Sequence, residues 1–194
     1  MNCPYDSLEY DPEIHHRRST RLSRYDYSGR GAYFVTICTH QKKHMFGEVV
    51  EGEMKPSEYG KIITLYWKDL SRRYPIVELD EFVLMPNHIH GIIRIVGAEP
   101  VGAIHELPRQ KSARAIHESP LQKRRKMLLP KIIGYFKMNT AKRINETRNT
   151  PALAVWQRNY YEHVVRNDDE LNKTRDYIVT NPLRWQTDPE NLNL

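Results

Sequence analysis

The feature that most constrains the fold is a pair of strand-like runs separated by only two residues. Val77–Met85 and His88–Val96 are strand-like in composition, and only Pro86 and Asn87 lie between them. A two-residue connection is too short for a crossover helix, so the two strands must pair antiparallel. A chain with such a hairpin in its middle builds at least part of its fold on an antiparallel sheet.

Other strand-like segments can extend this sheet. Ala32–His40 is β-branched and aromatic, as a buried strand should be, and Phe46–Val50 with Glu53–Pro56 predicts a second hairpin. Ala152–Arg166 is strand- or loop-like. The predicted sheet therefore has three strands or more.

Three segments show the spacing of amphipathic helices. Apolar residues recur three and four positions apart, and Ser57 and Asn167 stand where an N-cap is expected. The predicted helices are Ser57–Tyr74, Arg124–Thr147 and one from Asn167 to near Pro182. In chain order the elements are strand, hairpin, helix, two strands, helix, strand and helix. This order predicts an α+β fold, a ferredoxin-like antiparallel sheet with helices packed on it and a further C-terminal helix.

The length of 194 residues fits one domain of ordinary size, or one domain with ordered arms. We expect residues 1–30 to form a basic, extended N-terminal arm. Residues 31–185 should form the domain itself, and residues 186–194 a C-terminal tail. A polar insertion at about 97–123 contains the near-repeat AIHELP and AIHESP. One near-copy is too little for a solenoid, so we interpret the segment as a flexible surface insertion, with DNA inserted in frame as its source.

The charge favours a polyanionic partner. Lys and Arg number 30 against 24 Asp and Glu, a formal net charge of +6, as is typical of nucleic-acid-binding proteins, although a merely soluble basic protein would look similar. The two cysteines, Cys3 and Cys38, are too few for a disulfide framework or a cysteine zinc site. No stretch approaches the length of a membrane span. We expect a cytoplasmic, nucleoid-associated protein with no membrane contact.

His88 and His90 form a candidate metal-binding pair. Side chains alternate along a strand, so both imidazoles point to one face while Ile89 points to the other. The pattern alone is weak, because paired histidines on a strand are often ordinary surface or hydrogen-bonded residues.

Tyr177 and Asn181 supply the complementary groups. They stand four residues apart on the last predicted helix and so share one face. If that helix covers the sheet face carrying His88 and His90, the result is a metal site of two imidazoles and one amide with a phenol beside it. Such a site suits phosphate chemistry, in which a cation neutralises charge on the phosphate and the phenol attacks phosphorus. Without these partners, Tyr177 would be read as a core or helix-face aromatic.

Tyr160 and Tyr161 compete as nucleophiles, because they also lie in a basic aromatic segment. Neither has an amide at helical spacing, so they rank second. The segment WQRNYY is better interpreted as a DNA-contacting surface. The predicted DNA contacts are Arg17, Arg18, Arg21, Arg24, Arg125, Lys131, Lys137, Lys142, Trp156 and Arg158.

Three runs resemble the REP-associated tyrosine transposases, which are related to the single-tyrosine insertion-sequence transposases. They are FVLMPNHIHGIIRI (82–95), VWQRNYYEHVVRN (155–167) and RDYIVTNPLRW (175–185). The likeness extends to the segments 25–40 and 132–145, and so covers most of residues 17–185. Residues 97–123 depart from the compact pattern of that family.

The resemblance implies a ferredoxin-like fold, a His-hydrophobic-His pair, a helix-borne tyrosine nucleophile and an amide that completes the metal site. These positions correspond to His88, His90, Tyr177 and Asn181.

The functional hypothesis is a metal-dependent endonuclease and strand transferase that forms a 5′-phosphotyrosine intermediate on single-stranded or hairpin DNA. The resemblance implies repetitive palindromic elements as substrate. Oxygen-rich phosphate chemistry favours Mg²⁺ or Mn²⁺, although two imidazoles also accept softer ions. We expect a monomer or a homodimer. Two alternatives stay open: a non-catalytic DNA-binding regulator on the same fold, and a metallohydrolase that activates water, which would need further ligands.

Overall fold

The computed structural model describes residues 25–97 and 127–191. Its elements are β1 (Gly31–Cys38), η1 (His40–Lys42), β2 (Gly47–Val50), β3 (Glu53–Pro56), α1 (Glu58–Arg73), β4 (Val77–Leu84), β5 (His88–Ile95), α3 (Leu128–Thr147), β6 (Tyr161–Val165), α4 (Asp168–Thr180) and η2 (Pro182–Thr187). The insertion beyond residue 97, most of the predicted arm and the last three residues lie outside the described ranges.

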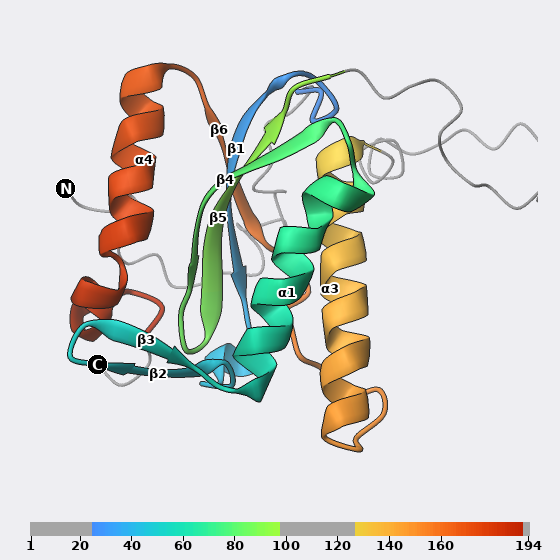
Figure 1. The fold of residues 1–194 in the computed structure, drawn as a ribbon, viewed down its shortest axis with the longest axis vertical. Helices are drawn as coiled ribbons and strands as arrows, with labels where there is room; N and C mark the ends of the chain where they lie inside the picture. Colours follow the sequence, from blue (N-terminus) through green and yellow to red (C-terminus); the bar gives the residue numbers. More distant parts are fainter. Residues whose placement is uncertain (1–24, 98–126, 192–194) are drawn as a thin grey trace, which may run out of the picture.

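Four strands form one antiparallel sheet in the order β4-β5-β1-β6, and β2 and β3 form a separate hairpin (Figure 1). With α1 between β1 and β4, and α3 between β5 and β6, the chain follows the βαββαβ order of a ferredoxin-like fold. The predicted fold class is therefore confirmed, as are both predicted hairpins.

The two predicted caps are confirmed. The Ser57 side chain accepts a hydrogen bond from the Gly60 N–H at 3.2 Å, and the Asn167 side chain accepts one from the Glu170 N–H at 2.8 Å. The Glu170 carboxylate in turn accepts the N–H of Arg166 at 2.7 Å. These local bonds satisfy helix-end donors that would otherwise lack partners, and so fix where α1 and α4 begin.

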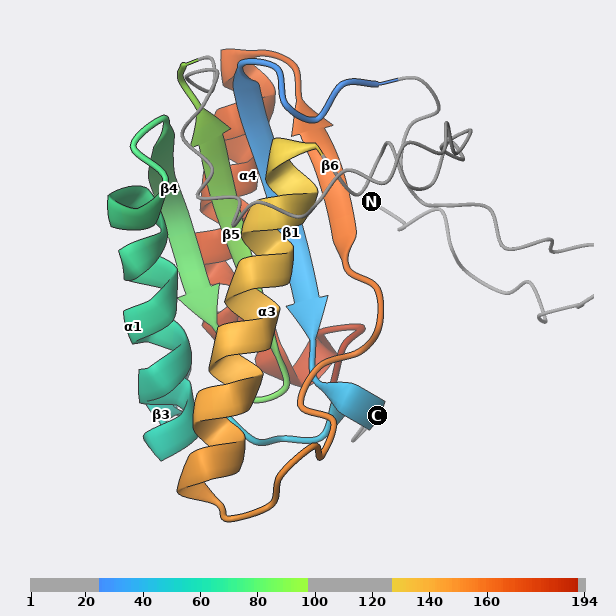
Figure 2. The same cartoon turned by 90° about the vertical axis from the view of Figure 1, so that its right-hand side faces the viewer.

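The main core lies between one face of the sheet and helices α1 and α3 (Figure 2). On β5, Ile89, Gly91 and Ile93 point to this face because side chains alternate along the strand. A Cβ on Gly91 would clash with the Trp67 ring of α1, so glycine lets the helix lie close to the strand. On α3 the predicted apolar stripe is buried.

The end of the predicted N-terminal arm belongs to this core. Tyr27 is 2% exposed and its ring lies 6.0 Å from that of Tyr33. The Tyr27 carbonyl also accepts the N–H of Leu129 at 3.2 Å. Residues 25–30 are therefore packed rather than extended away from the domain.

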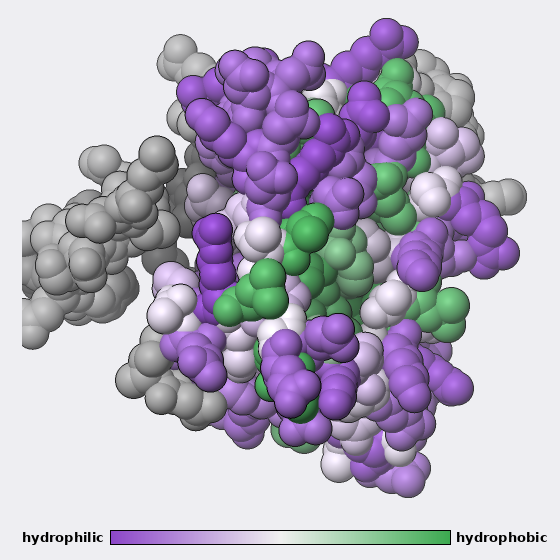
Figure 3. Space-filling view, turned by 60° about the vertical axis from the view of Figure 1, so that its left-hand side comes forward, coloured by the Kyte–Doolittle hydropathy of each residue, from purple (hydrophilic) through white to green (hydrophobic). Residues whose placement is uncertain are grey.

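Helix α4 lies on the opposite face of the sheet and contacts β4 (Figures 1 and 2). Within α4, all of which is described, Ile178 is the one buried side chain. Arg175 makes a two-pronged ion pair with Asp80 of β4, at 2.7 and 2.6 Å. Seen from the α4 side, apolar side chains gather near the middle of the surface between hydrophilic ones (Figure 3).

The segment after α4 folds back across the end of the sheet. Lys42 forms an ion pair with Glu190 at 3.1 Å, and the side chains of Asp188 and Asn191 are buried. Residues 186–191, expected to be a tail, are thus part of the folded domain. None of the helices within residues 25–97 and 127–191 is long and apolar enough to cross a membrane.

Candidate metal and nucleophile site

His88 and His90 lie side by side on the α4 face of β5. Their Nε2 atoms are 3.0 Å apart, and the side chains are 0% and 3% exposed. The strand alternation predicted from the sequence is confirmed, and it brings both imidazoles to one point beneath α4.

Hydrogen bonds to the outer ring nitrogens orient both imidazoles. The Asn87 amide donates to the carbonyls of Lys42 and Glu190, at 3.2 and 2.6 Å, which turns its oxygen toward His88 Nδ1 at 2.8 Å. That oxygen can only accept, so His88 Nδ1 carries the proton and its Nε2 presents a lone pair. His90 Nδ1 lies 2.8 Å from the Thr36 hydroxyl. Such partners on the far nitrogen are typical of metal-binding histidines.

Burial keeps both rings neutral. Loss of hydration lowers the pKa of His88 well below its ordinary value, and the neighbouring His90 lowers it further. Burial alone lowers the pKa of His90 to about 3. Neutral imidazole is the form that binds a cation.

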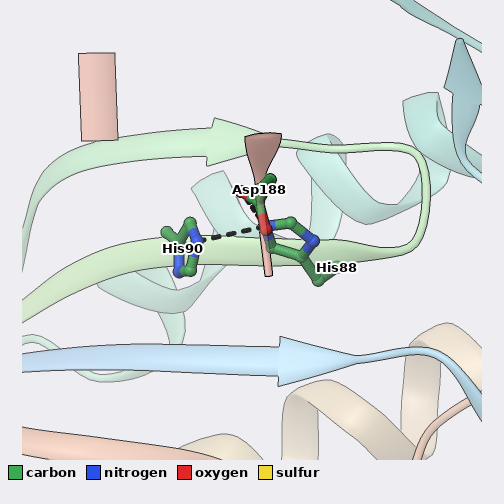
Figure 4. A group of neighbouring side chains, drawn as sticks. All are labelled: His88, His90 and Asp188. Carbon is green, nitrogen blue, oxygen red and sulfur yellow. Dashed lines mark hydrogen bonds and ion pairs between the residues drawn. The ribbon is translucent and has the colours of Figure 1, made fainter. Parts of the chain in front are cut away.

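Asp188 brings a carboxylate to the pair (Figure 4). Its Oδ2 lies 4.0 Å from His88 Nε2, and the ligand atoms of the three residues lie within 4.8 Å of one another. The side chain is buried, which raises the pKa of its carboxyl. Sequence reasoning missed this residue, because nothing in its local pattern distinguishes it from a polar tail.

Asn181 follows the last residue of α4. Its side chain hydrogen-bonds Asp188, which offsets part of the rise that burial causes in the pKa of that carboxyl. Its Oδ1 is buried and has no hydrogen-bond partner among the described residues. A buried acceptor without a partner is costly and is often explained by an ion or water.

These donors fit a divalent cation. The two Nε2 atoms lie 3.0 Å apart, so one ion could bind to both of them. Two nitrogens, a carboxylate oxygen and a buried amide oxygen make a mixed set that suits Mn²⁺ as well as softer ions.

Tyr177 stands at the opening of this cluster. Its hydroxyl lies 3.4 Å from His90 Nε2, and the side chain is 38% exposed. The helical spacing from Tyr177 to Asn181 therefore brings both residues to the histidine face, as the sequence predicted.

The competing tyrosines occupy other positions. Tyr161 pairs across β6 and β1 with Thr36, which itself faces His90, so it lies two strands from that histidine, about 9.5 Å at the usual strand spacing. Tyr160 is half-buried and packs against the core.

The structure corrects the expectation for Trp156. Its side chain is 7% exposed and packs against Phe46 and Phe136, with ring centroids 5.1 and 5.7 Å away. The indole N–H donates to the Thr140 hydroxyl at 2.9 Å. A ring held in the core offers no face to a nucleobase.

The other predicted DNA contacts are dispersed. Lys131, Lys137 and Lys142 belong to α3, on the sheet face away from the histidines, and Lys137 Nζ donates to the carbonyls of residues 157–159 at 2.7 to 3.3 Å. Arg158 is exposed in the loop before β6. The remaining predicted contacts lie outside the described residues: Arg17, Arg18, Arg21, Arg24 and Arg125.

Comparisons with known proteins give two sequence relatives from Haemophilus influenzae. An uncharacterized protein is 37% identical over 94% of this chain and 97% of its own length. A protein named as a candidate REP-associated tyrosine transposase is 26% identical over 83% of this chain and 75% of its own length. No family model matches the chain.

Two solved structures were also found. A REP-associated tyrosine transposase bound to a REP hairpin is 17% identical, with a TM-score of 0.48 over 85% of this chain and 73% of its own. A candidate transposase from Deinococcus radiodurans is 13% identical, with a TM-score of 0.43 over 82% of this chain and 95% of its own. At 37% identity over nearly its whole length, the chain belongs to the same family as the uncharacterized Haemophilus influenzae protein, and it is similar in sequence to a protein named as a candidate REP-associated tyrosine transposase.

Proposed function

We propose that the protein is a metal-dependent nuclease and strand transferase that cuts single-stranded or hairpin DNA through a 5′-phosphotyrosine intermediate. One observation carries the proposal: the Tyr177 hydroxyl lies 3.4 Å from His90 Nε2, at the opening of a buried group of two histidines and an aspartate. The name of the 26% identical relative supports repetitive palindromic DNA as the substrate.

His88, His90, Asp188 and Asn181 would hold the cation, which we expect to be Mg²⁺ or Mn²⁺. When bound, it supplies neutralisation of the charge that builds up on the non-bridging phosphate oxygens. The protein holds the ligands rigidly for this purpose, because Asn87 and Thr36 fix the two imidazoles from behind.

The chemistry of Tyr177 is a transfer of phosphorus from one oxygen to another. The phenol oxygen bonds to phosphorus, and the bond from phosphorus to the 3′ oxygen breaks. The phenol releases its proton to water and the departing 3′ oxygen takes one up, so no net charge is left over. Because the phosphotyrosine bond is a diester, a free 3′ hydroxyl can reverse the step without a high-energy cofactor.

The nucleophile is tested by replacing its oxygen. Tyr177→Phe should abolish a denaturation-resistant protein–DNA adduct on a labelled palindromic hairpin and leave hairpin binding largely unchanged. Tyr161→Phe, a second exposed tyrosine on the same sheet face, is the matched control and should still form the adduct. An active Tyr177→Phe enzyme would remove the tyrosine from the mechanism.

The need for a cation is tested by replacing the side chains that would bind it. His88→Ala and His90→Ala should each lower the rate of adduct formation by on the order of 10²-fold or more, because each removes a holder of the charge-stabilising ion. Asn181→Ala should be milder, because water can replace one ligand. The affinity for Mn²⁺, measured by calorimetric titration, should likewise fall more in the two histidine variants than in Asn181→Ala. Full adduct formation in EDTA would contradict a metal-dependent mechanism.

Asp188 gives one alternative a specific basis. A metallohydrolase that activates water needs more ligands than the two histidines, and Asp188 supplies one. The two mechanisms separate on product: water attack gives nicked DNA without adduct, and Tyr177→Phe would still cut.

A further inference from the structure

The described elements cover only part of the sheet face that carries the histidines. Helix α4 lies toward β4, so the adjacent surface of β1 and β6 is less covered. Phe34 and His163 of this surface are half-buried, and Tyr161 is 43% exposed. Their place on the histidine face follows from the strand register, in which Phe34 lies opposite His163 and Thr36 opposite both Tyr161 and His90.

Aromatic rings line this surface up to the candidate nucleophile. The Phe34 ring stacks on His90, with centroids 5.3 Å apart and an angle of 24° between the planes. The Tyr161 and Tyr177 rings stand edge-on to Phe34, at 6.3 and 6.1 Å. Rings that are only partly covered by protein are what nucleobases stack on in proteins that bind single strands.

A basic pocket lies at the far end of the same face. It has a volume of about 370 Å³, and Arg30, Arg94 and Arg166 line it where β1 begins and β5 and β6 end. All three arginines are exposed. Two acids temper the charge, since Asp168 also lines the pocket and Arg94 pairs with Glu78 at 3.1 Å. The arginines still exceed the acids, so the pocket favours an anion such as a phosphodiester.

The register sets the spacing between the pocket and the site. Thr36 lies opposite His90, and Ala32 lies opposite Arg94. Four residues of strand separate these pairs, about 13 Å at the usual rise. That length takes at most about four nucleotides, since phosphates rise 3.4 Å per nucleotide along B-DNA and spread further in an extended strand.

The aromatic surface of Phe34 and Tyr161 and the pocket of the three arginines together form what we call the groove. We propose that this groove binds the single strand that leads away from the scissile phosphate. One base stacks on Phe34 and Tyr161, and a phosphate a few nucleotides along the strand enters the arginine pocket. The inference rests on the proposed function, because it takes Tyr177 as the point where the strand is attacked. It assigns DNA affinity to the histidine face, in contrast to the lysines of α3 on the other face.

The arginine pocket is tested by the salt dependence of binding. Fluorescence anisotropy with a labelled single strand of about 12 nucleotides, within the usual range of site sizes, measures affinity without cleavage. In Arg30→Ala/Arg166→Ala, the slope of log affinity against log salt should become shallower by about 1.4, because two phosphate contacts are lost at about 0.7 each. The matched control, Arg72→Ala/Arg143→Ala, removes the same charge from α1 and α3. Equal slopes in the two double variants would show that the arginine pocket does not bind the phosphates of the strand.

The aromatic surface is tested with the same probe. Tyr161→Leu should weaken binding by about 5- to 160-fold, the range for one base stacked on a ring. Tyr161→Phe keeps the ring and should restore the affinity. Leu153→Ala, at an exposed apolar residue outside the groove, should bind as the wild type. If Tyr161→Leu also binds as the wild type, no base stacks there.

The outcomes separate this inference from the proposed function. An adduct formed by Tyr177→Phe would show that another group attacks, while the anisotropy results would still decide the groove. Conversely, unchanged binding in the groove variants would reject the groove even if Tyr177 proves to be the nucleophile.

Discussion

The hydrogen bond between Thr140 and Trp156 offers a sharp test of the core. Thr140 Oγ1 accepts the indole N–H at 2.9 Å and donates to the Phe136 carbonyl at 2.7 Å. Thr140→Val keeps the shape of the side chain and removes both bonds. The indole N–H would remain buried without an acceptor.

The expected cost follows from that burial. An intramolecular hydrogen bond contributes about 1 kcal/mol to the free energy of unfolding. A buried donor that is left without a partner lowers that free energy by about 1–3 kcal/mol. We therefore expect Thr140→Val to lower the free energy of unfolding by about 2 kcal/mol. With a urea m-value of about 2 kcal/mol/M, the midpoint of urea unfolding should fall by about 1 M.

A double-mutant cycle isolates the bond. Trp156→Phe removes the N–H and keeps a ring in the core, so the effect of Thr140→Val should shrink by about 1–2 kcal/mol in that background. If the effects of the two substitutions on the free energy of unfolding are additive, the two side chains do not form this hydrogen bond. Because the ring lies in the core, folded Trp156→Phe should also bind single-stranded DNA as the wild type; weaker binding with unchanged stability would return Trp156 to the DNA surface.

Two further perturbations test packing and charge. Gly91→Ala should destabilise the protein by about 1–3 kcal/mol in urea unfolding, because the new Cβ would clash with Trp67. Gly134→Ala on α3 is the control: no atom of another described element lies within 4 Å of the new Cβ, so the substitution should stabilise the protein by about 0.5–1 kcal/mol. The Arg175 guanidinium lowers the pKa of Asp80 in the folded state, so this ion pair stabilises the fold at neutral pH and is lost as pH falls through the folded pKa. Asp80→Asn should therefore be less stable than the wild type at neutral pH, and the gap should close in acid; a gap independent of pH would contradict the pairing.

Much of the fold could be predicted because its signals are local. The two-residue link at Pro86 and Asn87 leaves only antiparallel pairing, and the alternation of β5 sets which side chains share a face. Ser57 and Asn167 mark helix starts with bonds to residues three positions away.

The parts that could not be predicted depend on distant neighbours. Asp188 joins His88 only because the chain after α4 folds back to the loop around Lys42 and Asn87. Trp156 stands in a polar, aromatic run that suits a DNA surface, and its burial is decided by Thr140 and Phe136 on α3. Local sequence carries no record of either partner.

The lysines of α3 show a related limit. Helical periodicity separates a core face from a polar face, and Leu129, Ile133 and Ile144 of the predicted apolar face are buried. It does not say on which side of the sheet the helix lies. Because α3 packs on the face away from the histidines, its lysines lie on the other side of the sheet from the proposed DNA groove.

The way α4 is attached bears on how a phosphate could enter the site. With the Tyr177 hydroxyl 3.4 Å from His90 Nε2, no phosphate fits between the attacking oxygen and the ligands. In the proposed mechanism, the phenol must therefore move outward before it attacks phosphorus. Within α4, Ile178 is the one buried side chain, and the ion pair with Asp80 lies on the edge strand β4. An element with few buried contacts opens at low free energy, whereas the histidines sit on a central strand paired on both sides. The proposed nucleophile thus stands on an element with few buried side chains, and the two proposed histidine ligands stand on a central strand.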